Sequence, residues 1–91
     1  MELKWTSKAL SDLARLHAFL APASPTAAAK AIQALVAAPG ALLGNPRIGE
    51  RLEEFEPREV RRILVGRYEI RYELQTSTVW ILRIWHTREE R

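Results

Sequence analysis

The fold of this chain is decided by the stretch Arg61-Arg62-Ile63-Leu64-Val65-Gly66-Arg67-Tyr68-Glu69-Ile70-Arg71-Tyr72-Glu73-Leu74. Its second half alternates between apolar and polar residues, which is the two-residue period of a β-strand. Between the halves, Gly66 and Arg67 form a two-residue connection with Gly first, typical of a type II′ hairpin turn. We therefore predict a β-hairpin whose first strand covers residues 60–65. The second strand should have one solvent-exposed face, formed by Glu69, Arg71, Glu73 and Gln75.

A further strand is predicted at residues 79–86, which are apolar on both faces. Strict alternation divides the large side chains into two sets, Trp80, Leu82 and Ile84 on one face and Val79, Ile81 and Trp85 on the other. A strand of this kind belongs in the interior of a sheet. Arg83 interrupts the pattern. Because a half-buried guanidinium needs partners, we expect Arg83 to pair with a Glu across the sheet or to point to a concave functional surface.

The N-terminal half has the pattern of a short strand followed by two helices. Residues 2–6 alternate, and an apolar stripe at helical spacing then runs from about Ser7, a suitable N-cap, to Leu20. Two prolines in residues 21–25 interrupt the helix. Ser24 followed by Pro25 is a favourable start for a second helix that extends to about residue 38. Its inward side is expected to hold Ala28, Ala31, Ile32, Leu35 and Val36.

Together these elements predict an α+β fold: an N-terminal strand, a helical hairpin, and then an antiparallel meander of three to four strands. Residues 52–55 form either a short edge strand or an extended loop. We expect the helices and the last strand to share one core, made of Leu13, Leu16, Ile32, Leu35, Trp80, Leu82 and Ile84. No internal repeat or linker is present, so residues 1–91 are predicted to be a single domain.

The composition limits the classes of function. The chain has 91 residues, a net charge of +3 and no Cys, so it has neither a disulfide nor a thiolate nucleophile. Eleven Arg stand against three Lys, and Arg offers a bidentate fork for phosphate or carboxylate. No segment was expected to reach the length of about 20 apolar residues needed to span a membrane. A cytoplasmic protein without membrane contact is the resulting expectation.

No metal or cofactor site is expected. The two His residues, His17 and His86, have no ligand spacing, and the four Gly residues are too scattered for a phosphate-binding loop. His17 is interpreted as a residue at the edge of the core. His86 ends the most apolar strand close to Arg88, which is a suitable place for acid–base chemistry. The alternative is that His86 has a structural role and donates a hydrogen bond to a carbonyl or to a Glu.

Several features in this order resemble the small toxins of bacterial toxin–antitoxin pairs, the RelE/ParE superfamily. The residues that carry the resemblance are the opening strand with Trp5, the helix with Ala9, Asp12 and Leu13, the loop Asn45-Pro46-x-x-Gly49, the hairpin described above, and the strand that ends in His86-x-Arg88. The resemblance covers nearly the whole chain.

The resemblance implies one of two activities. RelE-like members are ribosome-dependent mRNA endoribonucleases that carry an Arg directly after the first aromatic residue of the second hairpin strand. This chain has Glu69 there, and residues 50–56, where a basic loop is expected, are net acidic. A C-terminal Tyr that some ribonucleases carry is also absent. We therefore favour the ParE-like group, which binds DNA gyrase, has no known catalytic residues of its own, and is neutralised by a cognate antitoxin.

Two alternatives remain open at this point. If the chain is a RelE-like ribonuclease acting on the ribosome and its mRNA, the candidate catalytic residues are His86, Arg88, Arg62 and Arg61; otherwise we expect none. A non-toxic binding module on the same fold is the second alternative.

Overall fold

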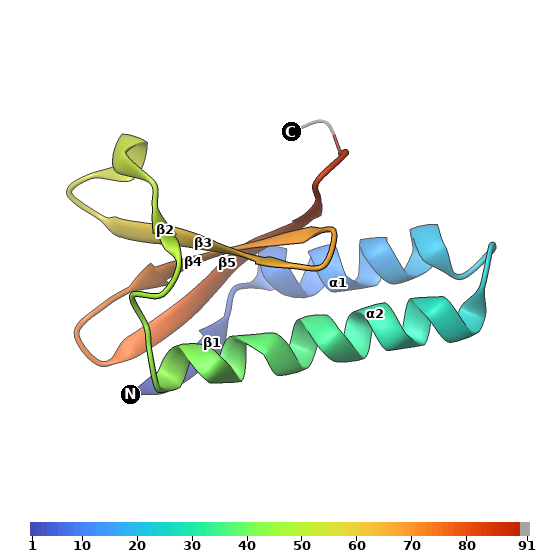
Figure 1. The fold of residues 1–91 in the computed structure, drawn as a ribbon, viewed down its shortest axis with the longest axis horizontal. Helices are drawn as coiled ribbons and strands as arrows, with labels where there is room; N and C mark the ends of the chain where they lie inside the picture. The colour runs from blue at the N-terminus through green and yellow to red at the C-terminus, as the bar shows by residue number, and fades with distance from the viewer. Residues whose placement is uncertain (90–91) are drawn as a thin grey trace.

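The computed structural model describes residues 1–89 and consists of a five-stranded sheet with a helical hairpin on one side (Figure 1). Glu90 and Arg91 lie outside the described residues. In chain order the elements are β1 (Glu2–Trp5), α1 (Ser7–Leu20), α2 (Pro25–Ala37), the 3-10 helix η1 (Ala38–Leu43), β2 (Glu50–Arg51), the 3-10 turn η2 (Glu53–Phe55), β3 (Glu59–Val65), β4 (Tyr68–Leu74) and β5 (Thr78–His86).

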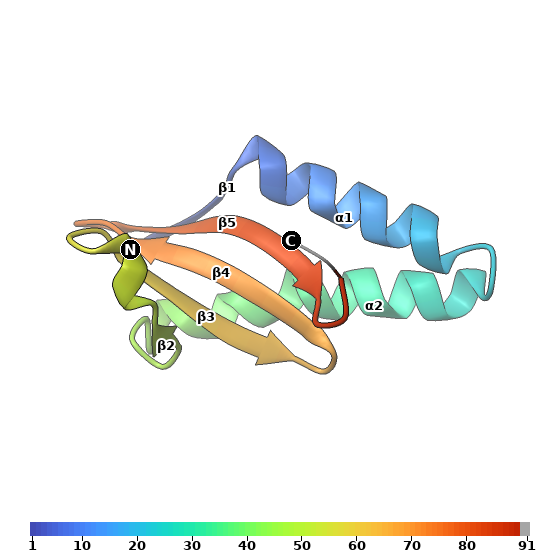
Figure 2. The same cartoon turned by 90° about the horizontal axis from the view of Figure 1, so that it is seen from above.

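The strands are arranged in the order β1-β5-β4-β3-β2 (Figure 2). The last four form the predicted antiparallel meander, whereas β1 lies parallel to β5, with Glu2 opposite Thr78 and Trp5 opposite Ile81. The α+β class is confirmed, but the sheet is mixed. Residues 52–55 do not form a strand; the edge strand is limited to β2, and η2 follows it.

Both helices begin at side-chain caps. Ser24 Oγ accepts a hydrogen bond from Ala27 N at 3.1 Å, as its position before Pro25 predicted. The cap of α1 is Thr6 and not Ser7, because Thr6 Oγ1 both accepts from Ala9 N at 3.0 Å and donates to Leu82 O at 2.9 Å. The same hydroxyl therefore starts α1 and fastens it to β5.

The second helix, α2, ends at Ala37, as the sequence predicted, and the 3-10 helix η1 continues it. With η1 it spans Pro25–Leu43, 19 residues with a mean hydropathy of 1.4, which is enough by length and composition to cross a membrane. This corrects the expectation that no segment approaches such a length. It is weak support for a membrane span, because the core helix of a soluble protein passes the same test. Leu35 and Leu42 on this segment are fully buried. Val36 is 51% exposed, contrary to the inward side expected for it.

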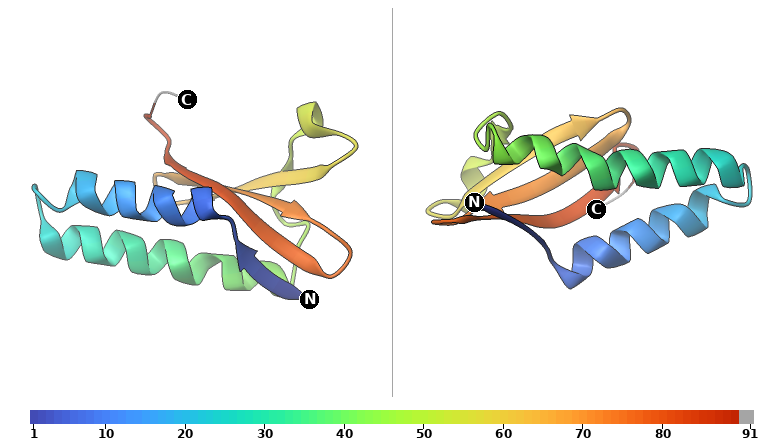
Figure 3. Two further views of the ribbon diagram at one scale, coloured as in Figure 1. Left: turned by 180° about the vertical axis from the view of Figure 1, so that it is seen from behind. Right: turned by 90° about the horizontal axis from the view of Figure 1, so that it is seen from below.

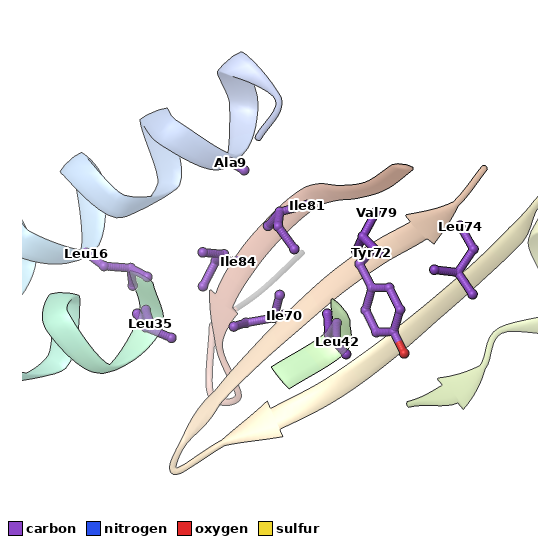
Figure 4. Close-up of a cluster of buried hydrophobic side chains, with 10 residues drawn as sticks. All are labelled: Ala9, Leu16, Leu35, Leu42, Ile70, Tyr72, Leu74, Val79, Ile81 and Ile84. Carbon is purple, nitrogen blue, oxygen red and sulfur yellow. The ribbon is translucent and has the colours of Figure 1, made fainter. Parts of the chain in front are cut away.

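One core lies between the helical hairpin and the sheet (Figures 3 and 4). Leu16, Leu35 and Ile84 are buried there as predicted, and Leu13 and Ile32 pack against it partly buried. The other members of the buried cluster are Ala9, Leu42, Ile70, Tyr72, Leu74, Val79 and Ile81.

A β-bulge overturns the predicted faces of β5. Arg71 pairs with Arg83, but Tyr72 pairs with Ile81, so Leu82 is an extra residue without a counterpart on β4. The side chains on either side of a bulge change their alternation. As a result Val79, Ile81 and Ile84 all face the helices, and Trp80 and Leu82 are not in the core where the sequence placed them.

The predicted solvent-exposed face of β4 is also wrong. Glu69 is 1% exposed and Glu73 is 8% exposed. Both carboxylates lie within ion pairs on the side of the sheet opposite the core cluster, which we call the second face. The hairpin turn itself agrees with the prediction, because Gly66 has φ +58° and Arg67 does not have a positive φ, as a type II′ turn requires.

Candidate functional site

His86 and Arg88 lie together where β5 ends. The His86 ring contacts Tyr68 edge to face, with ring centroids 5.2 Å apart. Its Nδ1 accepts a hydrogen bond from Arg88 N at 3.1 Å, and its backbone N donates to Glu89 Oε1 at 2.7 Å. The backbone N–H of His86 and its ring nitrogen Nδ1 thus both form hydrogen bonds that hold the turn after β5.

Arg61 has a structural position. Its side chain is 15% exposed, and it donates to Glu59 Oε2 at 3.0 Å and to the carbonyl oxygens of Arg47 and Gly49 at 3.2 and 2.7 Å. These bonds fix the chain before β2. Arg62 points to the other side of β3, where it donates to Glu50 at 2.8 Å and contacts Glu69 at 3.4 Å.

The four sequence candidates do not converge on one point. In the sheet register His86 lies opposite Tyr68 and Arg61 lies opposite Tyr72. Four residues along a strand correspond to about 13 Å. Arg62 is on the second face, away from both. The fold therefore brings His86 and Arg88 together but separates them from Arg61 and Arg62.

Glu69 is the most unusual residue of the second face. Its carboxylate is almost completely buried and contacts Arg62 Nη1 at 3.4 Å and Arg71 Nη2 at 3.2 Å. A buried carboxylate is stable when it is paired and hydrogen-bonded. Both neighbouring cations are consequently directed toward Glu69.

Aromatic rings hold the arginines of this face in place. The Arg71 guanidinium lies 5.3 Å from the Phe55 ring centroid and 4.7 Å from that of Trp85, and Arg83 lies 5.0 Å from Trp85. Cation–π contacts of this kind favour a planar guanidinium with a fixed orientation. Phe55 belongs to η2, so this short turn is part of the second face.

Asp12 is the partner of Arg83, and the sequence did not predict it. The Asp12 carboxylate is 3% exposed and accepts from Arg83 Nε, from Arg15 Nη2 and from Ile84 N. Burial raises the pKa of Asp12, but the hydrogen bonds from Arg83, the Ile84 N–H and Arg15 outweigh it and hold the pKa below its usual value. The available signal was the helical spacing that places Asp12 on the same side as Ala9 and Leu16.

Tyr72 organises the loop ahead of β2. Its hydroxyl donates to Pro46 O at 2.8 Å and accepts from Gly49 N at 3.0 Å. Burial raises the pKa of Tyr72, which keeps this hydroxyl protonated as a donor. A Cβ at Gly49 would lie 2.5 Å from the Tyr72 hydroxyl and 2.6 Å from Arg62 O, so only Gly fits. The Asn45-Pro46-x-x-Gly49 motif is thus explained by packing.

Two of the pockets formed by residues 1–89 bear on these side chains. One, of about 480 Å³, lies beside the ends of β3 and β4 and is lined by Met1, Arg47, Pro57, Arg58, Glu59, Glu73, Leu74, Gln75 and Thr76. The other, of about 340 Å³, is lined by Thr6, Lys8, Phe55, Arg58, Arg71, Leu82 and Arg83. Within residues 1–89, no three His, Asp or Glu side chains lie close enough together to hold a metal ion.

Comparison with known proteins gives a consistent result. One solved structure, from a chromosomal ParDE toxin–antitoxin system of P. aeruginosa, matches with a TM-score of 0.77 and 27% sequence identity, covering 94% of this chain and 95% of that one. No curated protein matches. The family model for the ParE toxin of type II toxin–antitoxin systems (parDE) matches residues 3–91. This chain therefore belongs to the ParE toxin family of type II toxin–antitoxin systems.

Proposed function

We propose that this protein is a cytoplasmic toxin that acts by binding DNA gyrase and not by cutting RNA, and that a cognate antitoxin neutralises it. The observation that carries the proposal is the position of Glu69. The ribonucleases of the superfamily resemble this chain around the hairpin but have an Arg at this position. Here the position holds a buried carboxylate paired with Arg62 and Arg71.

The chemistry of RNA cleavage makes this substitution important. A 2′-hydroxyl attack on phosphate develops negative charge that must be met by cations and hydrogen-bond donors aimed at it. Beside Glu69 the nearest two guanidinium groups, Arg62 and Arg71, are directed to its carboxylate, which repels a phosphate at that position. The other candidate groups, His86 and Arg88, lie together but apart from Arg61. Binding to a protein target requires no such arrangement.

The gyrase step is tested with purified components. The toxin is added to DNA gyrase and relaxed plasmid, and supercoiling and the accumulation of cleaved DNA are measured together. We expect inhibited supercoiling with trapped cleavage complexes. A parallel reaction with topoisomerase I controls for general binding to DNA. Normal supercoiling at a large excess of toxin would exclude gyrase as the target.

The antitoxin is proposed to cover apolar surface on the helical hairpin. The hairpin extends beyond the β3–β4 turn (Figure 1). Phe19 lies in the last turn of α1 at that end and is 75% exposed, and Leu10 on the same helix is 54% exposed. The two are nine residues apart, which is an odd number of half-turns, so they lie on opposite sides of α1. Contiguous exposed apolar surface marks a site that binds a partner, and Phe19 and Leu10 are each proposed as the centre of one such surface.

This arrangement allows a direct comparison of two surfaces. Antitoxin encoded beside the toxin gene is titrated against wild type, Phe19→Ser and Leu10→Ser, and the melting temperature is followed. Wild type should gain stability, because a ligand that binds the folded state stabilises it by mass action. One Ser variant should lose most of that gain and the other should keep it, which identifies the covered side. An open sheet edge is the binding site if both variants behave as wild type.

A further inference from the structure

The smaller pocket has the chemical character of an anion site. Four cationic side chains line it, Lys8, Arg58, Arg71 and Arg83, and no carboxylate of residues 1–89 does. They come from four separate parts of the chain: the start of α1, the segment before β3, β4 and β5. The pocket therefore collects positive charge from across the second face at the point where α1 begins.

Three of the four cations are paired with carboxylates that do not line the pocket: Arg58 with Glu73, Arg71 with Glu69 and Arg83 with Asp12. Arg58 donates to Glu73 through Nε and Nη2 at 3.1 and 2.7 Å, and Arg83 donates to Asp12 through the same two nitrogens at 2.8 and 3.1 Å. This geometry leaves the Nη1 nitrogen of each guanidinium for another acceptor. The carboxylates hold the guanidinium groups still, which lowers the entropy cost of binding a ligand.

Two further features favour an anion at this place. Thr6 caps α1 and also lines the pocket, so the positive end of the helix dipole is directed toward it. Lys8 follows in the first turn, is exposed, and has no ion-pair partner among residues 1–89. Within the described part of the chain, the positive charge of Lys8 is therefore available to bind an anion.

We propose that this pocket binds a phosphate group that carries a nucleoside, either a free nucleotide or one unit of a nucleic-acid strand. Three guanidinium groups and one ammonium group supply more N–H donors than the two oxygens of a carboxylate can accept, and a phosphate offers more oxygens to them. Phe55 and Leu82 add apolar wall against which a sugar or base can pack. Binding of a phosphate group at this pocket does not require that gyrase is the target of the protein.

The test is direct binding by the purified full chain. The probes are a fluorescently labelled single-stranded DNA oligonucleotide, followed by anisotropy, and ATP, AMP and inorganic phosphate as competitors. Lys8→Glu is the test variant, because an acidic residue in the first turn is compatible with the helix and the variant should fold. Lys30→Glu is the matched control, since Lys30 is an exposed residue of α2 and does not line the pocket.

Lys8→Glu should weaken binding by at least about tenfold, because it removes one charge contact and adds a repelling carboxylate, and it should lower the slope of log Kd against log salt by at least about one. Lys30→Glu should change the binding affinity and the salt slope much less. If ATP or AMP competes at concentrations similar to those at which the oligonucleotide binds, the phosphate comes from a free nucleotide. If neither ATP nor AMP competes, the phosphate belongs to a nucleic-acid strand.

Three results would overturn the proposal. The first is wild-type protein that binds neither nucleotide nor oligonucleotide at physiological salt. The second is equal loss of binding in Lys8→Glu and Lys30→Glu, which is an effect of net charge alone. The third is stronger competition by a poly-Glu peptide than by an oligonucleotide of the same charge, which would make the pocket a site for an acidic protein segment.

Discussion

Asp12 and Arg83 form a bidentate ion pair that joins α1 to β5, with distances of 2.8 and 3.1 Å between their atoms. Asp12 also accepts from the backbone N–H of Ile84, beyond the point where β1 stops pairing with β5. Arg15 donates to Ile84 O at 3.1 Å and pairs with Glu89. Side chains of α1 thus form hydrogen bonds with the backbone of β5 at the part of its edge that β1 does not pair with.

The first prediction follows from this pair. Asp12→Ala removes the acceptor for a buried backbone N–H and for a half-buried guanidinium, and should lower the free energy of unfolding by about 2–4 kcal/mol. Urea denaturation followed by Trp fluorescence measures it. Glu2→Ala, which removes an exposed carboxylate, should cost less than about 0.5 kcal/mol. Equal stability of the two variants would show that the edge is held by other contacts.

The second prediction concerns pH. Because the pKa of Asp12 in the folded state lies below its ordinary value of 3.8, its contribution to stability is complete above that value. It is lost as the pH falls from there through the folded-state pKa. Glu59 behaves likewise, since the hydrogen bond from Arg47 outweighs burial and lowers its pKa from 4.5. The free energy of unfolding should therefore fall below about pH 4.5, and should fall less steeply in Asp12→Asn than in wild type.

The third prediction compares two glycines. Gly49→Ala should lower the free energy of unfolding by about 1–3 kcal/mol, because the new methyl overlaps the Tyr72 hydroxyl and Arg62 O. Gly40→Ala meets no atom within 4 Å and should be neutral or slightly stabilising. Thermal unfolding of the two variants side by side provides the measurement. A normal melting temperature for Gly49→Ala would mean that the loop can move away from Tyr72.

The fourth prediction tests the bulge. Ile81→Ala and Ile84→Ala should each cost about 2–5 kcal/mol, since both side chains are fully buried. Leu82→Ala, for which strict alternation predicted a similar cost, should cost about 1 kcal/mol or less, because Leu82 is half-buried outside the core. The order of the three variants in urea denaturation distinguishes the two registers. A Leu82 variant as unstable as the Ile variants would contradict the bulged pairing.

The fifth prediction concerns mechanism. Growth inhibition should survive His86→Gln, and purified wild type should leave ribosome-bound mRNA uncut in primer extension. The physical reason is that Glu69 takes up the two nearest cations of the second face. Arg88→Ala is assayed beside His86→Gln. Site-specific cuts that disappear in either variant would establish a ribonuclease and make His86 its general acid or base.

Local signals in the sequence were sufficient for the helices and the hairpin. Ser24 and Pro25 fix the start of α2 through contacts within one turn, and Gly66 fixes the hairpin through its own backbone conformation. Such features depend on neighbouring residues, so the sequence displays them directly. Most core residues on α1 and α2 were predictable for the same reason, because helical spacing defines which side of the helix a residue occupies; Val36 is the exception.

Features that depend on distant residues were not predictable. Alternation cannot show that Leu82 is an extra residue in β5, because the bulge exists only relative to β4. Alternation also predicted that Glu69 and Glu73 are exposed to solvent. It could not show that arginines from β3, β4 and the segment before β3 pair with them and bury them. Candidate site residues were chosen by type and position, and their separation on the sheet depends on register.

The place of β5 in the sheet determines when the fold can be completed during synthesis. The final strand pairs with both β1 and β4, and the backbone N of Glu2 donates to Ser77 O. While the chain is being synthesised, β1 has no neighbouring strand to pair with, among the elements of residues 1–89, until β5 has left the ribosome. Contacts of such long sequence separation form late and slowly. The folded domain therefore forms only once β5 has been synthesised, however early the helices appear.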